Sequence, residues 1–232
     1  MKPDKHKHLS LKICEYCKNN KDVNIPEEII EACTKGDLVI FAGAGISTES
    51  SLVFPFSFYE DIEGEINLKK RGSLSFPELM TKYCDVKKGK TPLLQKIRER
   101  IEYIKSFPEL YQVATSFHRE LSTIYPIKEI ITTNWDDFFE KECGAIPIVT
   151  PDDFAFWNTP DRKVFKIHGS INNLGSIIAT EKDYRKCYRI LQHGIIGSSL
   201  KLMLATKVVI FLGYSFKDYD FNKIHSFLAK EM

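Results

Sequence analysis

The sequence predicts an α/β fold: a doubly wound, Rossmann-like parallel sheet with a helical module inserted after its first strand. An apolar strand runs straight into two glycines within residues 38–45, and short apolar strands alternate with helices after Pro126. Between them, residues 50–126 have the apolar spacing of helices, which adds the inserted module.

Composition and charge are those of an ordinary globular protein. The 232 residues are 43% hydrophobic and 28% charged, which suffices for one domain with a full core. A net charge of +2 and a pI near 8.1 give no strong attraction to nucleic acid or to a membrane. The basic runs at 69–71 and 87–90 are interpreted as solvated loops, so direct nucleic-acid binding is not expected.

The expected location of the protein is the cytoplasm. No apolar stretch approaches the roughly 20 residues that cross a bilayer, and the N-terminus lacks the apolar centre of a secretory signal. The six cysteines are scattered, which is typical of free thiols in a reducing compartment.

Residues 1–25 are expected to form a polar N-terminal arm ahead of a domain at 26–232. Cys14 and Cys17 have the spacing of half a zinc site or of a redox pair, but no second such pair follows in the sequence. This favours a helical or disordered arm. A helix is then predicted from Pro26 to Cys33, because proline stands in its first turn with acidic residues behind it.

The first strand is expected at residues 38–42, where the apolar run is typical of a buried strand. Gly43 and Gly45 are expected to allow a tight turn with positive φ that a ligand approaches closely. A helix that starts at Ile46 or Ser47 would direct its free N–H groups at the same point, which suits a phosphate or pyrophosphate. The segment therefore predicts a dinucleotide site.

The module inserted at residues 50–126 is predicted to be helical throughout. Apolar residues recur at helical spacing in 94–104 and again in 110–124, and Pro108 separates the two segments. A helical stretch between two strands of one sheet is typical of an insertion after the first strand.

Later strands are expected to end in residues suited to chemistry. Strands at 127–132, 163–167 and 207–212 lead into Asn134, His168 and Gly213 respectively, and a shorter strand is predicted at 145–149. Ligands of parallel sheets bind outside the carboxyl ends of the strands, so these dispersed segments are expected to form one site. That convergence favours an enzyme.

Hydride transfer is not favoured as its reaction. The usual fingerprint places a third glycine or alanine where Thr48 stands, and an acidic residue at the end of a next strand that helices replace here. Asn134 either caps the helix expected at 136–142 or directs its amide into the cleft; the two are compatible if Asp136 is the cap. His168 is either a structural histidine or the base that removes a proton from a sugar hydroxyl.

Together these segments resemble the sirtuin (Sir2) family. Residues 43–47 look like its glycine-alanine-glycine cofactor turn, and residues 133–136 look like its threonine-glutamine-asparagine-x-aspartate segment, with threonine in place of glutamine. His168 and Gly169 match its catalytic histidine-glycine pair, and residues 213–215 match its glycine-x-serine contact to phosphate and ribose. The resemblance spans residues 37–220 in the family's order.

Three departures separate the chain from sirtuin deacylases. Only Cys187 lies beyond His168, so the two cysteine pairs of the zinc module are absent from the sequence and no metal is expected. Residues 51–56 lack the glycine and the arginine of the sirtuin cofactor loop. The chain ends soon after Gly213, from which we expect either a C-terminally truncated domain or a sheet that another chain completes.

The departures resemble the Sir2-like domains of bacterial antiphage defence proteins, which hydrolyse NAD+ to ADP-ribose and nicotinamide. The resemblance implies an NAD+ hydrolase in which Asn134, His168 and Asp136 are catalytic. The residues it implies for binding NAD+ are Gly43, Ala44, Gly45, Ser47, Thr133, Gly213 and Ser215. Such an enzyme must stay silent until triggered, so we expect a homo-oligomer, a controlling partner protein or domain, or both. Protein deacylation, ADP-ribosyl transfer and non-catalytic sensing of NAD+ or ADP-ribose remain alternatives.

Overall fold

The computed structural model describes residues 24–66, 68 and 71–214. Ser215 and nearly all of the N-terminal arm predicted at 1–25, including Cys14 and Cys17, lie outside the described residues.

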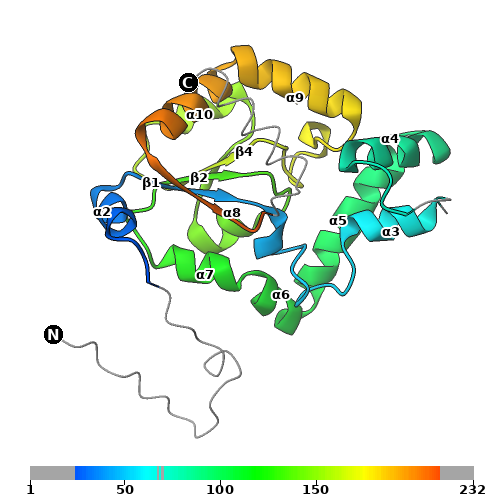
Figure 1. Ribbon diagram of the computed structural model, residues 1–232, viewed down its shortest axis with the longest axis horizontal. Helices are drawn as coiled ribbons and strands as arrows, with labels where there is room; N and C mark the ends of the chain where they lie inside the picture. The colour runs from blue at the N-terminus through cyan, green and yellow to red at the C-terminus, as the bar shows by residue number, and fades with distance from the viewer. Residues whose placement is uncertain (1–23, 67, 69–70, 215–232) are drawn as a thin grey trace, which may run out of the picture.

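A five-stranded parallel sheet forms the centre of the protein, which confirms the predicted α/β class (Figure 1). Its strands are β1 (Leu38–Ala42), β2 (Glu129–Thr132), β3 (Ile146–Ile148), β4 (Lys163–Lys166) and β5 (Val208–Leu212), in the order β3-β4-β2-β1-β5. Every residue of β1 is buried, because helices cover both faces of the sheet. This is why its sequence is continuously apolar.

Different helices cover the two faces of the sheet (Figure 1). The helices are α2 (Glu27–Lys35), α3 (Phe58–Glu65), α4 (Phe76–Val86), α5 (Thr91–Ser106), α6 (Pro108–Ala114), α7 (Ser116–Ser122), α8 (Phe138–Cys143), α9 (Glu181–His193) and α10 (Ile195–Thr206). Val39 and Phe41 of β1 pack with α9 and α10, whereas Leu38, Ile40 and Ala42 pack with α2, α7 and α8. The alternation along β1 thus assigns its side chains to two separate cores.

All the α-helices between β1 and β2 belong to the segment α3–α7. Helices α3, α4 and α5 lie together beside the sheet and share an apolar core that includes Ile62, Leu79 and Ile97 (Figure 1). Ile171 and Ile177, which follow β4, pack into the same core. The helices therefore rest directly on the loop after β4.

Capping residues define where several of these helices begin. Ser57 and Glu60 form a reciprocal capping box at the start of α3, and Thr180 and Asp183 form another at the start of α9. Pro108 stands at the first position of α6, where its missing N–H costs no hydrogen bond.

Candidate active site

Four strands end at the same level of the sheet. Ala42 of β1 pairs in register with Thr132 of β2 and with Leu212 of β5, and Thr132 pairs with Lys166 of β4. The loops that follow therefore line up side by side in the order His168, Asn134, glycine turn, Gly213. Three inter-strand spacings separate the first from the last, roughly 14 Å. The crevice of a doubly wound sheet is expected here, since the strand order reverses at β1.

Three glycines interlock at the centre of this row. The Gly45 N–H donates to the Gly213 carbonyl oxygen at 3.1 Å, and the Gly43 N–H donates to the Leu212 carbonyl oxygen at 2.8 Å. A Cβ atom on Gly43 would lie 2.7 Å from the Gly213 oxygen, and one on Gly45 would lie 2.8 Å from it. Glycine is therefore required because the loops after β1 and β5 touch.

The predicted positive φ of the glycine turn is wrong. Gly43 is extended, with φ −103°, and the positive φ belongs to Gly213, at +71°. The predicted helix start at Ile46 or Ser47 is also wrong: a short 3-10 helix spans Ala44–Ile46, and the next α-helix begins at Phe58. Ser47 leaves the helical region, with φ −144° and ψ −98°.

This geometry changes how the turn contributes to an anion site. The N–H groups of Gly43, Gly45 and Ser47 all donate to carbonyl oxygens of the protein itself. Within 24–66, 68 and 71–214, no α-helix begins with its dipole at this point either. The turn therefore offers a close backbone surface to a ligand, without a free set of N–H donors from these three residues.

Asn134 is directed at the glycine turn. Its Nδ2 donates to the Gly43 carbonyl oxygen at 3.2 Å and to Ser47 Oγ at 3.3 Å. Its Oδ1 is buried and has no hydrogen-bond partner among the residues that the structure describes. Asn134 is not a helix cap, since α8 begins at Phe138, two residues later than predicted. A buried amide oxygen without a donor is costly, so this atom marks a position for a ligand hydroxyl or a water.

Asp136 holds the loop after β2 in place. Its Oδ2 accepts from Ser47 Oγ at 3.1 Å, and its Oδ1 accepts from the Phe138 N–H at 3.3 Å. The latter bond reaches the first N–H of α8, although Asp137 stands at the N-cap position of that helix. The carboxylate is buried within the protein and acts as an orienting group for Ser47 and the start of α8.

Sequence reasoning missed Lys166, which lies beneath this loop. Its side chain is fully buried, its Nζ donates to the Asp136 backbone carbonyl, and it forms an ion pair with Glu140 at 3.2 Å. Burial raises the pKa of Glu140, against the opposing effect of the Lys166 ammonium. The sequence feature that could have revealed Lys166 is a lysine two residues before His168, at an inward position of the strand.

His168 lies beside Asn134. Each stands two residues beyond the register pair Thr132–Lys166, on neighbouring strands. The ring is almost completely buried and packs edge-on against Tyr184, with ring centroids 5.1 Å apart. Gly169 follows with φ +85°, where a Cβ atom would meet the Ser176 carbonyl oxygen at 2.2 Å. The glycine after the histidine is therefore a requirement of the backbone.

Thr133 and Tyr214 join the ends of the central strands. The Thr133 Oγ1 and Tyr214 hydroxyl oxygens lie 2.8 Å apart, and the Tyr214 hydroxyl donates to the Ala42 carbonyl oxygen at 3.2 Å. The Thr133 hydroxyl is thus engaged within the protein. Its predicted contact with NAD+ requires Tyr214 to share it.

Arg100 is the second residue that sequence reasoning missed. It reaches from α5 to the loop at 48–57, the segment in which the sirtuin pattern fails. Its guanidinium donates to the Phe56 carbonyl oxygen at 2.8 Å, pairs with Glu49 at 3.3 Å and stacks 3.9 Å from the Phe54 ring centroid. Burial raises the pKa of Glu49, although the guanidinium opposes that shift. An arginine distant in sequence therefore anchors this loop.

Comparisons of the sequence with known proteins find a similar domain. Residues 128–232 match the family model described as SIR2-like domain. This part of the chain is therefore similar to SIR2-like domains. Asn134 and His168 lie inside the matched residues, and the glycine turn precedes them.

Similar proteins extend over most of the chain. It is 31% identical over 202 residues to NAD(+) hydrolase ThsA of Enterococcus faecium, covering 84% of this chain and 41% of that protein. It is 30% identical over 213 residues to the ThsA of Cytobacillus dafuensis, covering 89% and 41%. Defense-associated sirtuin 2 of Bacillus subtilis is 23% identical over 228 residues, covering 91% and 21%. The chain therefore spans less than half the length of these relatives.

The described residues hold neither a cluster of metal ligands nor a membrane-spanning helix. Within 24–66, 68 and 71–214, no three His, Cys, Asp or Glu side chains are grouped so that they hold a metal ion. Over the same ranges, no helix combines the length and apolarity that crossing a membrane demands.

Proposed function

We propose that this protein hydrolyses NAD+ at the bond between nicotinamide and ribose, releasing nicotinamide and ADP-ribose. The observation that carries the proposal is the unpartnered, buried Oδ1 of Asn134 beside His168 at the carboxyl edge of the sheet. The names of the ThsA relatives support it, as does the row of aligned strand ends, whose length suits a dinucleotide.

The reaction needs little from the protein beyond positioning and one base. As the glycosidic bond breaks, its electron pair moves to the pyridinium nitrogen, so nicotinamide leaves neutral and requires no proton. Positive charge develops on the ribose, as in other oxocarbenium-like transition states. The oxygen of a water then bonds to the anomeric carbon, and His168 accepts the proton that this water or a ribose hydroxyl releases.

Asn134 contributes by fixing a hydroxyl or a water. Its Nδ2 is committed to Gly43 and Ser47, so the amide cannot turn, and Oδ1 accepts a hydrogen bond from the water or the ribose. Asp136 holds Ser47 against the loop after β2 by accepting a hydrogen bond from the Ser47 hydroxyl. Gly43, Ala44, Gly45, Ser47, Thr133, Gly213 and Ser215 are proposed to border the diphosphate and its ribose.

The test is to incubate the purified chain with NAD+, with and without an acylated peptide, and to separate the products by chromatography. We expect ADP-ribose and nicotinamide from NAD+ alone. His168→Ala and Asn134→Ala should each lower the rate by at least about 100-fold, the scale of a lost general base or positioning group. Matched controls are His193→Ala and Asn24→Ala, because both residues are exposed and lie far in sequence from the carboxyl ends of the strands.

The other outcomes separate the alternatives. Product formation that requires the acylated peptide indicates deacylation, and ADP-ribose attached to protein indicates transfer. NAD+ that binds but stays intact, in every oligomeric fraction, contradicts the hydrolase and favours a sensing module.

We also infer a cytoplasmic role in antiphage defence, carried out by a homo-oligomer or under a controlling partner protein or domain. The names of the ThsA and defense-associated relatives support the defence role, and the free thiols at Cys33, Cys84 and Cys143 agree with a reducing compartment. Light scattering on the purified chain, paired with activity in each fraction, tests the assembly.

A further inference from the structure

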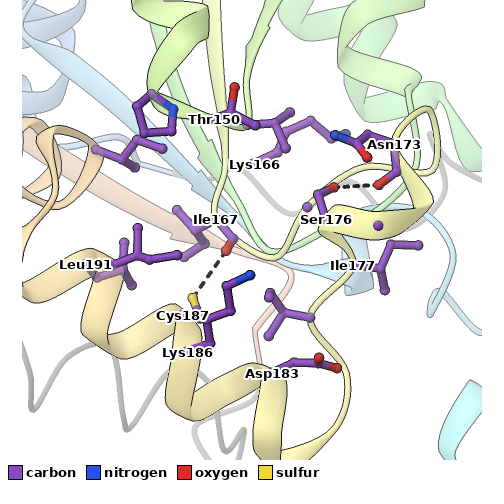
Figure 2. A pocket seen from close by; sticks show the side chains of 17 residues that line it. Thr150, Lys166, Ile167, Asn173, Ser176, Ile177, Asp183, Lys186, Cys187 and Leu191 are labelled. Atoms are coloured by element: carbon purple, nitrogen blue, oxygen red, sulfur yellow. Dashed lines mark hydrogen bonds between the residues drawn. The ribbon is translucent and has the colours of Figure 1, made fainter. Parts of the chain in front are cut away.

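A cavity lies behind the loop that carries His168. It has a volume of about 410 Å³ and is enclosed by the carboxyl ends of β3 and β4 and by α9 (Figure 2). Asn134, His168 and the glycine turn do not line it, and Lys166 and Gly169 are the lining residues that adjoin the candidate active site. Cavities of roughly 300–1,000 Å³ hold small molecules. The space is therefore separate from the NAD+ site and large enough for a ligand.

The interior of this cavity is mainly aliphatic. Ile167 comes from the end of β4, Ile178 from the loop that follows, Leu191 from α9 and Ile196 from α10. Figure 2 shows the Cys187 thiol on this wall, where it donates to the Ile167 carbonyl oxygen. Such walls bind an apolar group by removing it from water.

Among the described residues, the charged groups of the lining leave one ammonium group without a carboxylate partner. The Asp183 carboxylate already has partners, because it bonds with Lys90 and with Thr180 of its own capping box. Lys166 is paired with Glu140. Lys186 stands exposed on α9 at the cavity, and it has no carboxylate partner in the part of the chain that the structure describes.

We propose that this cavity is a second binding site, which takes a small amphipathic carboxylate. The apolar body occupies the aliphatic interior, and the carboxylate pairs with the Lys186 ammonium at the mouth. Only this class uses both features, because an apolar neutral ligand leaves Lys186 unused and a strongly polar anion gains nothing from the isoleucine walls.

The wall of the cavity is hydrogen-bonded to the catalytic loop. The Ile178 N–H donates to the His168 carbonyl oxygen at 3.0 Å, and the Ser170 N–H donates to Ser176 Oγ at 3.0 Å. A ligand that shifts this wall therefore shifts the backbone of His168. The consequence for NAD+ hydrolysis rests on the proposed function, whereas the binding site does not.

The test is calorimetric titration of the full chain with octanoate. We expect saturable binding at one site. Lys186→Gln should weaken it by about 3- to 10-fold, as for a partly exposed ion pair, while Lys182→Gln, exposed on the same helix but outside the cavity, should leave it unchanged. Ile190→Trp, which fills the cavity from a half-exposed position, should abolish binding.

Two controls accompany the titration. 1-Octanol should bind the wild-type chain more weakly than octanoate does. It should bind Lys186→Gln as well as it binds the wild type, because it carries no charge for Lys186 to pair with. Circular dichroism establishes that Ile190→Trp folds; if it does not, Lys186→Gln still carries the test. Octanoate that fails to saturate the wild-type chain, or that binds both cavity variants like the wild type, overturns the site.

A last pair of measurements separates this site from the hydrolase proposal. His168→Ala should bind octanoate as the wild type does, so the site stands even if NAD+ is not hydrolysed. Octanoate should change the rate of NAD+ hydrolysis by the wild type and leave that of Ile190→Trp unchanged. Binding without any change in rate overturns the coupling to His168.

Discussion

The side-chain Nδ2 of Asn134 donates to the backbone carbonyl oxygen of Gly43, with the two atoms 3.2 Å apart. Through Ser47, the same amide is connected to the Asp136 carboxylate. The loop after β2 is thereby bonded to the turn after β1, so the proposed catalytic amide and the glycine turn form one unit. Changes to the turn should therefore reach Asn134.

Gly213→Ala should destabilise the protein and lower NAD+ hydrolysis. Alanine at φ +71° is strained, and its Cβ would lie 2.7 Å from the Ile46 nitrogen and 2.8 Å from the Gly43 carbonyl oxygen. Strain and overpacking together suggest a loss of about 3 kcal/mol in the free energy of unfolding. Urea unfolding measures it. In Gly64→Ala, an exposed position of α3 with open space around it, stability should rise by about 0.5–1 kcal/mol. Equal effects at the two positions would contradict the interlocked turn.

The sheet and the order of the site segments could be predicted from the sequence, because buried parallel strands are continuous apolar runs that end in polar residues. The conformation of the turn could not. A glycine that allows positive φ and a glycine that allows two backbones to touch look alike in sequence, and only the approach of Gly213 distinguishes them at Gly43.

The contacts that Arg100 and Lys166 make with distant parts of the chain could not be predicted from the sequence either. Arg100 bonds to the Phe56 carbonyl oxygen across 44 positions of the sequence, which depends on how α5 packs. Lys166 appeared as an ordinary strand lysine, since its burial depends on Glu140 from α8. Sequence patterns report which face a residue occupies, whereas these contacts depend on which elements meet.

Lys166→Met should be strongly destabilising. It leaves the buried Glu140 without its cation and removes the donor to the Asp136 carbonyl, which suggests a loss of about 3–5 kcal/mol in chemical unfolding. The double variant Lys166→Met/Glu140→Leu should recover most of that stability, because no lone charge stays buried. Its rate of NAD+ hydrolysis should nevertheless remain about 10-fold low, since Asp136 has lost its support. Lys35→Met, at an exposed ion pair, should cost less than about 0.5 kcal/mol. A fully active double variant would show that Lys166 serves folding alone.

Arg100→Lys should raise KM for NAD+ more than it lowers kcat. Lysine keeps the charge, but it loses the stacking on Phe54 and the fork that bonds Phe56 of the loop and Asp61 of α3. A less ordered loop at 48–57 should raise KM for NAD+ by about 5-fold, with kcat reduced less. Steady-state kinetics measure both. Arg98→Lys, exposed on the same helix, is the matched control. A change in kcat alone would mean that Arg100 does not act through substrate binding.

His118 should make the protein acid-sensitive between pH 7 and pH 5. The imidazole is fully buried among Phe117, Phe138 and Phe139, and burial lowers its pKa to about 4. In the unfolded chain histidine titrates near its ordinary pKa of about 6.5, so between these values the unfolded state binds the proton and the folded state does not. The stability from this group is therefore complete above pH 6.5 and is lost as the pH falls toward 4. The loss between pH 7 and pH 5 should be about 2 kcal/mol.

His118→Phe removes this dependence while keeping an aromatic ring among the three phenylalanines. The difference in unfolding free energy between wild type and variant, measured in urea at several pH values, should grow in favour of the variant by about 2 kcal/mol from pH 7 to pH 5. Burial raises the pKa of Glu140, which acts in the opposite direction in both proteins and cancels in the difference. His193→Phe, at an exposed position of α9, should follow the wild-type curve. Parallel curves for wild type and His118→Phe would mean that the buried imidazole accepts its proton in the folded state as readily as in the unfolded chain.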